Sequence, residues 1–452
     1  MRRLVFIAHS CQNLSNPFIY KASGIYIKGD TKRRLVLAPI ESFGVSLFTY
    51  ISFRAIIAGI TAICVSIFGG KYFIKWMLDH HIYEIVREID KDDNVKEHNV
   101  PTMGGLFVIF AILLPCLLLG KLSNVYLILL LITTVLMGIV GFADDYIKTF
   151  KKNKAGLNGW WKIAGQVLLG LIVGLTLRFS PEVTMNEVVT SHIENNVVVI
   201  DKTPEIKSTQ TTIPFVKHHN FNYADLFSWL GDENKYRAGW IFFVFMTILV
   251  VAAVSNGANL NDGMDGMCAG NSIIIGVALM ILAYMSGSVV WSEYFDVMYI
   301  PGSEELTIFL AAFIGALVGY LWWNGYPAEV FMGDTGSLTI GGIIGVCAMV
   351  IHKELMLPLL CGIFLIESLS VIIQKAVFKL GKRPDKHMRV WRRTPIHHHF
   401  CTSVAKMKEN DPLSSVLFKD DSHLWAKPKI VLRFCIITLI LAALTILTLK
   451  IR

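Results

Sequence analysis

Long uncharged apolar runs alternate with short polar segments along most of the chain. A helix rises 1.5 Å per residue, so about 20 apolar residues span the hydrocarbon core of a bilayer. Ten such runs predict ten transmembrane helices, at residues 51–74, 103–120, 125–143, 161–177, 239–255, 269–287, 306–323, 336–351, 355–378 and 430–449. The pattern therefore predicts an all-α polytopic membrane protein.

Two polar segments interrupt this pattern. Residues 1–47 form a polar, basic N-terminal extension that precedes the first predicted span. Residues 178–237 are rich in Thr, Asn and Val, which favour strands and turns, and predict a small β-rich insertion. We expect one integral membrane domain over residues 48–452, and we assign no role to either segment. No cleavable signal sequence is evident at the start of the chain.

Composition narrows the class of protein. The 452 residues are 54% hydrophobic and 17% charged, whereas soluble domains carry about 25% charged residues. The eight cysteines form no Cys-x-x-Cys pair, so neither a zinc ribbon nor a disulfide framework is indicated. The net charge of +8 fits cytoplasmic loops beside anionic headgroups. We therefore expect a lipid bilayer, and not nucleic acid, as a partner.

Basic residues indicate which loops face the cytoplasm, because Lys and Arg concentrate there. They gather in two connections: Lys148, Lys151, Lys152 and Lys154 between spans three and four, and Lys382, Arg383, Lys386, Arg389, Arg392 and Arg393 between spans nine and ten. Odd-numbered connections are thus predicted to be cytoplasmic and both termini extracytoplasmic, with the insertion outside. The seven basic residues of the N-terminal extension disagree, but several later loops agree with one another.

With this topology, five polar clusters share the cytoplasmic face: residues 101–105, 144–145, 259–266, 324–337 and 395–400. Acidic and histidine side chains at the ends of spans are costly in lipid, so they are functional candidates. Asp144 and Asp145 repel each other, which favours a bound cation such as Mg²⁺ or one raised pKa. A charged boundary marker at the end of a span is the simpler alternative.

Asp334 is a further candidate carboxylate, and it lies between glycines at the predicted start of a helix. The backbone N–H groups there suit a phosphate, and Asp334 would hold the metal that neutralises it. A simple helix cap is the alternative. Residues 259–266 look like a calcium loop, but the twelfth position, counted from Asn261, is Ser272 and not glutamate. They form either a Gly-rich turn between helices or a site whose Asn and Asp side chains bind ribose, base or phosphate.

Three consecutive histidines, His397, His398 and His399, follow the second basic loop. Consecutive residues cannot share one helical face, and no zinc-ligand spacing accompanies them. They would meet phosphates together with nearby Arg and Lys, or simply lie in a solvated positive loop. Carboxylates, cations and Gly-rich helix mouths on one face together predict Mg²⁺-dependent phosphoryl transfer.

The five clusters resemble the motifs of the phospho-N-acetylmuramoyl-pentapeptide transferase family, within the polyprenyl-phosphate N-acetylhexosamine-1-phosphate transferase superfamily. The matching segments are Pro-Thr-Met-Gly-Gly at 101–105, Gly-Phe-Ala-Asp-Asp-Tyr-Ile-Lys at 141–148, residues 259–266, residues 327–337 and Pro-Ile-His-His-His-Phe at 395–400. The resemblance runs from about Phe48 to the C-terminus, interrupted by the insertion. It implies transfer of phospho-MurNAc-pentapeptide from its UDP carrier to undecaprenyl phosphate. The products would be lipid I and UMP, formed at the bacterial cytoplasmic membrane for peptidoglycan synthesis.

By motif match, the resemblance also implies site residues. Asp144, Asp145 and Asp334 would be catalytic, with Asp334 the Mg²⁺ ligand and Asp144 the acceptor of the lipid phosphate's proton. A covalent route with Asp334 as nucleophile stays open. The substrate-binding residues would be Lys96, Thr102, Lys148, Lys162, Asn259, Asp262, Asp265, Asn324, Phe331, Gly333, His397, His398 and His399. Phe331 would stack on uracil, and Glu367 and Gln374 would orient their helix. The oligomeric state is left open, with a homodimer among the options.

One departure and two rival functions remain. The family's usual basic residue five positions before Thr102 is Glu97 here, with Lys96 one place earlier. Residues 91–100 predict a loop, in which a shift of one residue would be tolerable. A polyprenyl-phosphate N-acetylhexosamine-1-phosphate transferase of another glycan pathway is the close rival, although the run at 395–400 favours the muramoyl enzyme. An ion-coupled transporter would instead need charges near mid-membrane and broken spans.

Overall fold

The computed structural model describes most of the membrane domain. The described residues are 25–26, 46–89, 95–153, 155–186, 189–194, 197–202, 205–215, 220–381, 387–411, 414–418 and 424–450. Most of the predicted N-terminal extension lies outside this part of the chain, as do the loop residues Lys154, Lys382, Arg383 and Lys386.

Every predicted span coincides with helix. Within the described residues, eight helices are long and apolar enough to cross a membrane. They are α3 (Ile51–Asp79), α5 (Val125–Thr149), α6 (Gly159–Phe179), α7 (Asp232–Asn261), α8 (Met267–Gly287), α10 (Leu306–Asn324, preceded by the 3₁₀ turn η4, Ser303–Glu305), α11 (Gly333–Val350) and α16 (Lys427–Thr448). The second predicted span, α4 (Gly105–Leu119), has 15 residues and is shorter than the predicted run.

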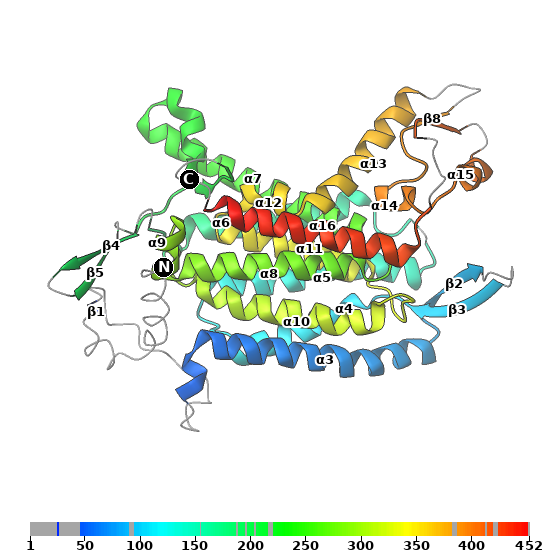
Figure 1. Ribbon diagram of the computed structural model, residues 1–452, viewed down its shortest axis with the longest axis horizontal. Helices are drawn as coiled ribbons and strands as arrows, with labels where there is room; N and C mark the ends of the chain where they lie inside the picture. Colours follow the sequence, from blue (N-terminus) through cyan, green and yellow to red (C-terminus); the bar gives the residue numbers. More distant parts are fainter. Residues whose placement is uncertain are drawn as a thin grey trace.

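The ninth predicted span, residues 355–378, is not one continuous helix. The 3₁₀ turn η5 (Glu354–Met356) and the short α12 (Leu357–Leu360) are followed, after Cys361, by α13 (Gly362–Leu380). The two parts meet at 78°, and Figure 1 shows α13 leaving the bundle at an angle. Pro358 suits the first turn of a helix, and Gly362 opposes helix continuity weakly. The expectation of an unbroken helix here is therefore corrected.

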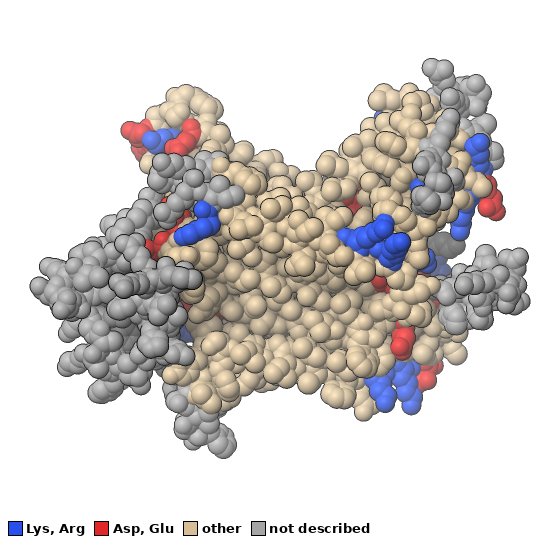
Figure 2. All heavy atoms as spheres, in the orientation of Figure 1, with Lys and Arg blue, Asp and Glu red and all other residues tan. Residues whose placement is uncertain are grey.

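The helices run side by side in a bundle with α11 at its centre (Figure 1). Every residue of α11 from Thr335 to Val350 is buried. Glycines permit the closest helix contacts, because a Cβ at Gly315 of α10 would lie 2.3 Å from the carbonyl oxygen of Gly59 in α3. Charged side chains gather toward the two ends of the bundle, with a broad uncharged band between them (Figure 2). This distribution is the one expected of a multi-pass membrane protein.

The insertion is partly β-structured, as predicted. Strands β4 (Val189–Glu194) and β5 (Val197–Lys202) form an antiparallel pair, which β1 (Ile25–Tyr26) extends in parallel, and β6 (Gln210–Thr212) pairs with β7 (Asn220–Asn222). The insertion also contains helix, since η3 (Tyr223–Leu230) and the start of α7 fall within residues 178–237. Thr212 connects the insertion to the segment that follows the C-terminal end of α11, because its N–H donates to the His352 carbonyl at 3.0 Å.

Candidate active site

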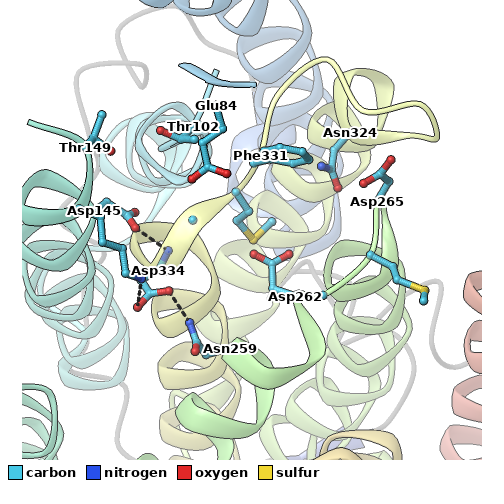
Figure 3. Close-up of a pocket in the computed structure, with 15 residues that line it drawn as sticks. Glu84, Thr102, Asp145, Thr149, Asn259, Asp262, Asp265, Asn324, Phe331 and Asp334 are labelled. Atoms are coloured by element: carbon cyan, nitrogen blue, oxygen red, sulfur yellow. Dashed lines mark hydrogen bonds and ion pairs between the residues drawn. The ribbon is translucent and has the colours of Figure 1, made fainter. Parts of the chain in front are cut away.

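The predicted polar clusters meet at the end of the bundle opposite the insertion. A pocket of about 260 Å³ opens there. It is lined by Glu84, Thr102, Asp145, Lys148, Thr149, Asn259, Asp262, Gly263, Met264, Asp265, Asn324, Phe331, Met332, Gly333 and Asp334. Figure 3 shows these side chains converging from α5, α7, the start of α11 and the loops between helices. Ten of the predicted site residues are among them.

Three carboxylates form the centre of the site. One oxygen from each of Asp144, Asp145 and Asp334 lies within 4.8 Å of the other two. The first two lie near the C-terminal end of α5, and Asp334 lies in the first turn of α11. The helices can approach here because Gly141 has no side chain: a Cβ at this position would lie 2.3 Å from the Asp334 carbonyl oxygen. This contact explains the glycine of the 141–148 motif.

Two lysines neutralise part of this charge. The Lys162 ammonium lies 2.5 Å from Asp334 Oδ2 and 3.0 Å from Asp144 Oδ1. The Lys148 ammonium lies 2.5 Å from Asp144 Oδ2 and 3.3 Å from Asp334 Oδ2. Asn259 Nδ2 donates to the other oxygen of Asp334 at 2.8 Å. Three carboxylates against two ammonium groups leave net negative charge, and carboxylate oxygens are the ligands that Mg²⁺ prefers. The donor set thus fits a divalent cation.

The loop before α11 is held by the Pro-Thr-Met-Gly-Gly segment. The N–H of Phe331 donates to the Pro101 carbonyl at 2.8 Å, and the N–H of Gly104 donates back to the Phe331 carbonyl at 2.8 Å. Gly105 N–H adds a third bond to the Met332 carbonyl at 2.9 Å. This backbone pairing places the Thr102 hydroxyl at the pocket, where it is buried without a hydrogen-bond partner among the described residues. Such a group is available to a substrate.

The opposite wall joins two loops. Asn324 accepts from the Gly266 N–H at 2.8 Å through Oδ1 and donates to the Val330 carbonyl at 2.8 Å through Nδ2. Asp265 accepts from the N–H of Ala328 at 3.2 Å. These two side chains therefore shape the pocket, whatever they contribute to binding. Beside them, burial and the carboxylates of Asp334, Asp145 and Asp265 raise the pKa of Asp262 to about 8.

The three histidines have different surroundings, and none of them lines the pocket surface. His397, in the short helix α14 (Ile396–His399), is buried with Nδ1 3.0 Å from Glu367 Oε1. A Cβ at Gly263 would lie 2.2 Å from its Nε2, so His397 supports the pocket loop from behind. Burial, His397, Arg393 and Lys427 lower the pKa of His398 to about 3.

The third histidine, His399, also has a lowered pKa. Burial and Arg392 lower the pKa of His399 to about 4, and its Nδ1 accepts from the Arg392 N–H at 3.2 Å. Gln374 of α13 accepts from the N–H groups of Val390 and Trp391 at 3.0 and 3.1 Å. Glu367 and Gln374 thus tie α13 to the histidine loop, in line with the orienting role expected of them.

The expectation of a loop at residues 91–100 is wrong for residues 95–100, the part that the structure describes. Val95–Pro101 is strand β3, paired antiparallel with β2 (Tyr83–Ile89). Consecutive strand residues face opposite sides, so a shift of one residue is not neutral in a strand. The side chains of Lys96 and Glu97 lie outside the described part, and substrate binding by Lys96 stays a prediction.

Sequence reasoning missed five pocket residues. Gly263, Met264 and Met332 lie inside predicted motifs, and Thr149 follows Lys148 by one residue, so their neighbours could have indicated them. Glu84 carries no local signal. Its place at the pocket depends on the pairing of β2 with β3, in which it stands opposite Val100.

The helical bundle and the carboxylate–lysine site together define a polytopic membrane protein with a charged pocket at one end of its helices. Residues 127–352 match the model of glycosyl transferase family 4. The chain is 56% identical over 411 residues to the phospho-N-acetylmuramoyl-pentapeptide-transferase of Bacteroides fragilis, covering 90% of this chain and 96% of that protein. It is 46% identical to the enzymes of that name from Flavobacterium psychrophilum, over 90% of this chain and 96% of that protein, and Porphyromonas gingivalis, over 92% and 98%. The chain belongs to the phospho-N-acetylmuramoyl-pentapeptide transferase family.

Proposed function

We propose that the protein transfers phospho-MurNAc-pentapeptide from UDP-MurNAc-pentapeptide to undecaprenyl phosphate, giving lipid I and UMP for peptidoglycan synthesis. Membership of the family supports the reaction. The observation that carries it is the cluster of Asp144, Asp145 and Asp334 with Lys148 and Lys162 at the end of a membrane-spanning bundle. Phosphoryl transfer needs positioned charges of this kind more than covalent chemistry from the protein.

The reaction exchanges one phosphorus–oxygen bond for another. An oxygen of the lipid phosphate attacks the sugar-linked phosphorus of the UDP-sugar, and the bridging oxygen leaves with UMP. Lys148 and Lys162 are proposed to move from the carboxylates to the phosphates, stabilising the charge on the attacked and leaving groups. Asp144, released from both ammonium groups, accepts the lipid phosphate's proton if it carries one.

Mg²⁺ is the proposed cofactor, with Asp334 as ligand and Asp145 beside it. The pocket lining carries five carboxyl groups, those of Glu84, Asp145, Asp262, Asp265 and Asp334, and the raised pKa of Asp262 still leaves four against the one ammonium of Lys148. A nucleoside diphosphate would be repelled from such a pocket without a cation. Bound there, Mg²⁺ would neutralise diphosphate charge and orient the reacting phosphate.

The remaining assignments concern the substrate and the route. Phe331 lines the pocket and is proposed to stack on uracil, near Asn259, Asp262 and Gly333. Both oxygens of Asp334 are engaged, one by Asn259 and one by lysines, which favours a role as anchor over one as nucleophile. We also propose that Lys96, Thr102 and the three histidines contact the substrate. A homodimer is a separate proposal.

The location of the charges argues against an ion-coupled transporter. Asp144 and Asp145 lie within six residues of the end of α5, and Asp334 is the second residue of α11. Coupling ions in transporters bind near the membrane midplane. A site at the ends of helices suits substrates that arrive from water and from the lipid surface.

We further propose a bacterial cytoplasmic membrane location with ten crossings, counting α4 and the bent α12–α13 pair, and with both termini outside. The site and Lys148, Lys151 and Lys152, at and after the end of α5, then face the cytoplasm, where a nucleotide sugar is available. The start of α3 and the end of α16 lie at the same end of the bundle as the insertion (Figure 1), which fits an even number of crossings.

This topology is testable by cysteine labelling. In a variant without the eight natural cysteines, Glu233→Cys lies at the insertion end and Asn153→Cys follows α5. Both side chains are exposed. A membrane-impermeant maleimide added to right-side-out vesicles is expected to modify the first cysteine and not the second. Permeabilised vesicles, in which both should react, serve as control. The reverse pattern would overturn the proposed orientation.

The choice of sugar separates the proposed function from its close rival. With undecaprenyl phosphate and Mg²⁺ held constant, we expect kcat/KM for UDP-MurNAc-pentapeptide to exceed that for UDP-N-acetylglucosamine by at least about 10²-fold, because the pocket would recognise polar groups that the smaller donor lacks. Equal or faster transfer from UDP-N-acetylglucosamine would assign the protein to another glycan pathway.

A further inference from the structure

Asp144 and Asp145 are adjacent in sequence, but their carboxylates have different partners. The oxygens of Asp144 face Lys148 and Lys162, and Oδ1 also accepts from the N–H of Leu157 at 2.7 Å. Those of Asp145 face the first turn of α11. Oδ1 accepts from the Asp334 N–H at 3.0 Å. Oδ2 accepts from the N–H of Thr335 at 2.8 Å and from its hydroxyl at 2.5 Å.

We propose that Thr335 is a positioning residue for the transfer reaction. Its hydroxyl holds Asp145, and Asp145 in turn holds the first turn of α11, which carries Asp334. Asp145 thus acts on the metal ligand through the backbone, whereas Asp144 faces the lysines and the phosphates. This inference rests on the proposed function, and it gives the two aspartates different roles: Asp145 positions Asp334, and Asp144 contacts the lysines.

The surroundings of Thr335 leave its hydroxyl little choice of partner. Its side chain is buried, and the bond to Asp145 is short, as expected of a hydroxyl donating to a carboxylate. Gly333, at φ +71°, turns the chain so that two N–H groups point at Asp145. A Cβ at Gly333 would lie 2.5 Å from Asp145 Oδ2, so the turn accepts no larger residue. The start of a helix also favours a negative charge.

The arrangement connects to the metal site through one residue. Asp334 supplies the N–H that Asp145 accepts and the carboxylate that Lys162 and Asn259 contact. Loosening the Asp145 contact would therefore let the Asp334 carboxylate move relative to the Asp144 carboxylate. Changing groups that orient a metal ligand typically costs about 10- to 100-fold in metal affinity or activity.

The test compares Thr335→Val, which removes the hydroxyl at nearly constant volume, with Thr335→Ser, which keeps it. Mn²⁺ binding is measured by electron paramagnetic resonance on the purified full chain without substrates, and turnover is measured with Mg²⁺. We expect Thr335→Val to weaken Mn²⁺ binding and lower kcat by about 10-fold each, with KM for both substrates within about twofold of the wild type. Thr335→Ser should recover most of both losses.

Thr339→Val is the matched control. Thr339 is also buried, one turn further along α11, but its hydroxyl donates only to the Thr335 carbonyl at 2.7 Å within the helix. It should leave Mn²⁺ affinity and kcat within about twofold of the wild type. Unfolding temperatures identify any variant that fails to fold, and Thr335→Ala then takes the place of Thr335→Val.

Three results would overturn the inference: wild-type Mn²⁺ affinity in folded Thr335→Val, no recovery in Thr335→Ser, or an equal loss in Thr339→Val. The double variant Asp145→Asn/Thr335→Val should be no worse than Asp145→Asn alone, because Thr335 acts through Asp145. A further 10-fold loss in the double variant would also contradict it. The Mn²⁺ arm needs no substrate, so it decides the inference even if the proposed sugar donor is wrong.

Discussion

Replacing Asp334 by asparagine is expected to abolish transfer, with turnover falling by at least about 10³-fold, the scale of losing a key charge in phosphoryl transfer. A neutral amide is a poor ligand for a hard cation. The substitution also removes the carboxylate that holds the ammonium of Lys162 at 2.5 Å. Turnover is measured with purified protein across a range of Mg²⁺ concentrations, and Mn²⁺ affinity should fall in parallel.

Asp232→Asn provides the control for this change. Asp232 lies at the start of α7, at the insertion end, and its side chain is 94% exposed. We expect its activity and metal affinity to match the wild type. Near-normal turnover in Asp334→Asn would show that the metal is held elsewhere or is not used.

The second large effect is expected at Asp144. Asp144→Asn should lower kcat by at least about 10²-fold, the scale of a lost general base. The amide cannot take a proton, and it no longer attracts Lys148 and Lys162 into the site. Mn²⁺ binding should suffer less than in Asp334→Asn, because Asp334 is retained. Steady-state kinetics and the Mn²⁺ measurement on the same preparations separate the two roles.

Two outcomes would contradict this account of Asp144. One is turnover within a few-fold of the wild type. The other is a loss of Mn²⁺ affinity as large as in Asp334→Asn with no further loss of turnover, which would make Asp144 a metal ligand and not a proton acceptor. Asp144→Glu keeps the charge on a longer side chain and should retain more activity than Asp144→Asn.

The helical framework could be predicted because membrane spans are encoded locally. A run of apolar residues is apolar whatever surrounds it, and helices lie at each of the ten predicted positions. The break at Cys361 was missed because composition alone does not register a bend. The β2–β3 pairing was missed for a different reason: strand pairing depends on two segments that meet in space, and neither segment states it alone.

The site was predictable to the level of which motifs meet, but not of which atoms meet. The side chains of adjacent residues in a helix point about 100° apart. Nothing in the sequence says which of Asp144 and Asp145 faces α11 and which faces α6. Thr335 lies within the 327–337 motif, but the sequence does not indicate that its hydroxyl donates a hydrogen bond to Asp145. Glu84 reaches the pocket through strand pairing, which depends on residues 16 positions away.

The central claim is that this pocket joins a sugar phosphate to a polyprenyl phosphate, and one assay tests it directly. Purified protein is incubated with undecaprenyl phosphate, Mg²⁺ and UDP-MurNAc-pentapeptide labelled in the sugar, and lipid-extractable label and UMP are measured together. We predict lipid I and UMP in equal amounts, loss of both on chelation of the metal, and recovery of both when Mg²⁺ is restored. Wild-type protein that forms neither product, or that releases UMP without labelling the lipid, would contradict the account.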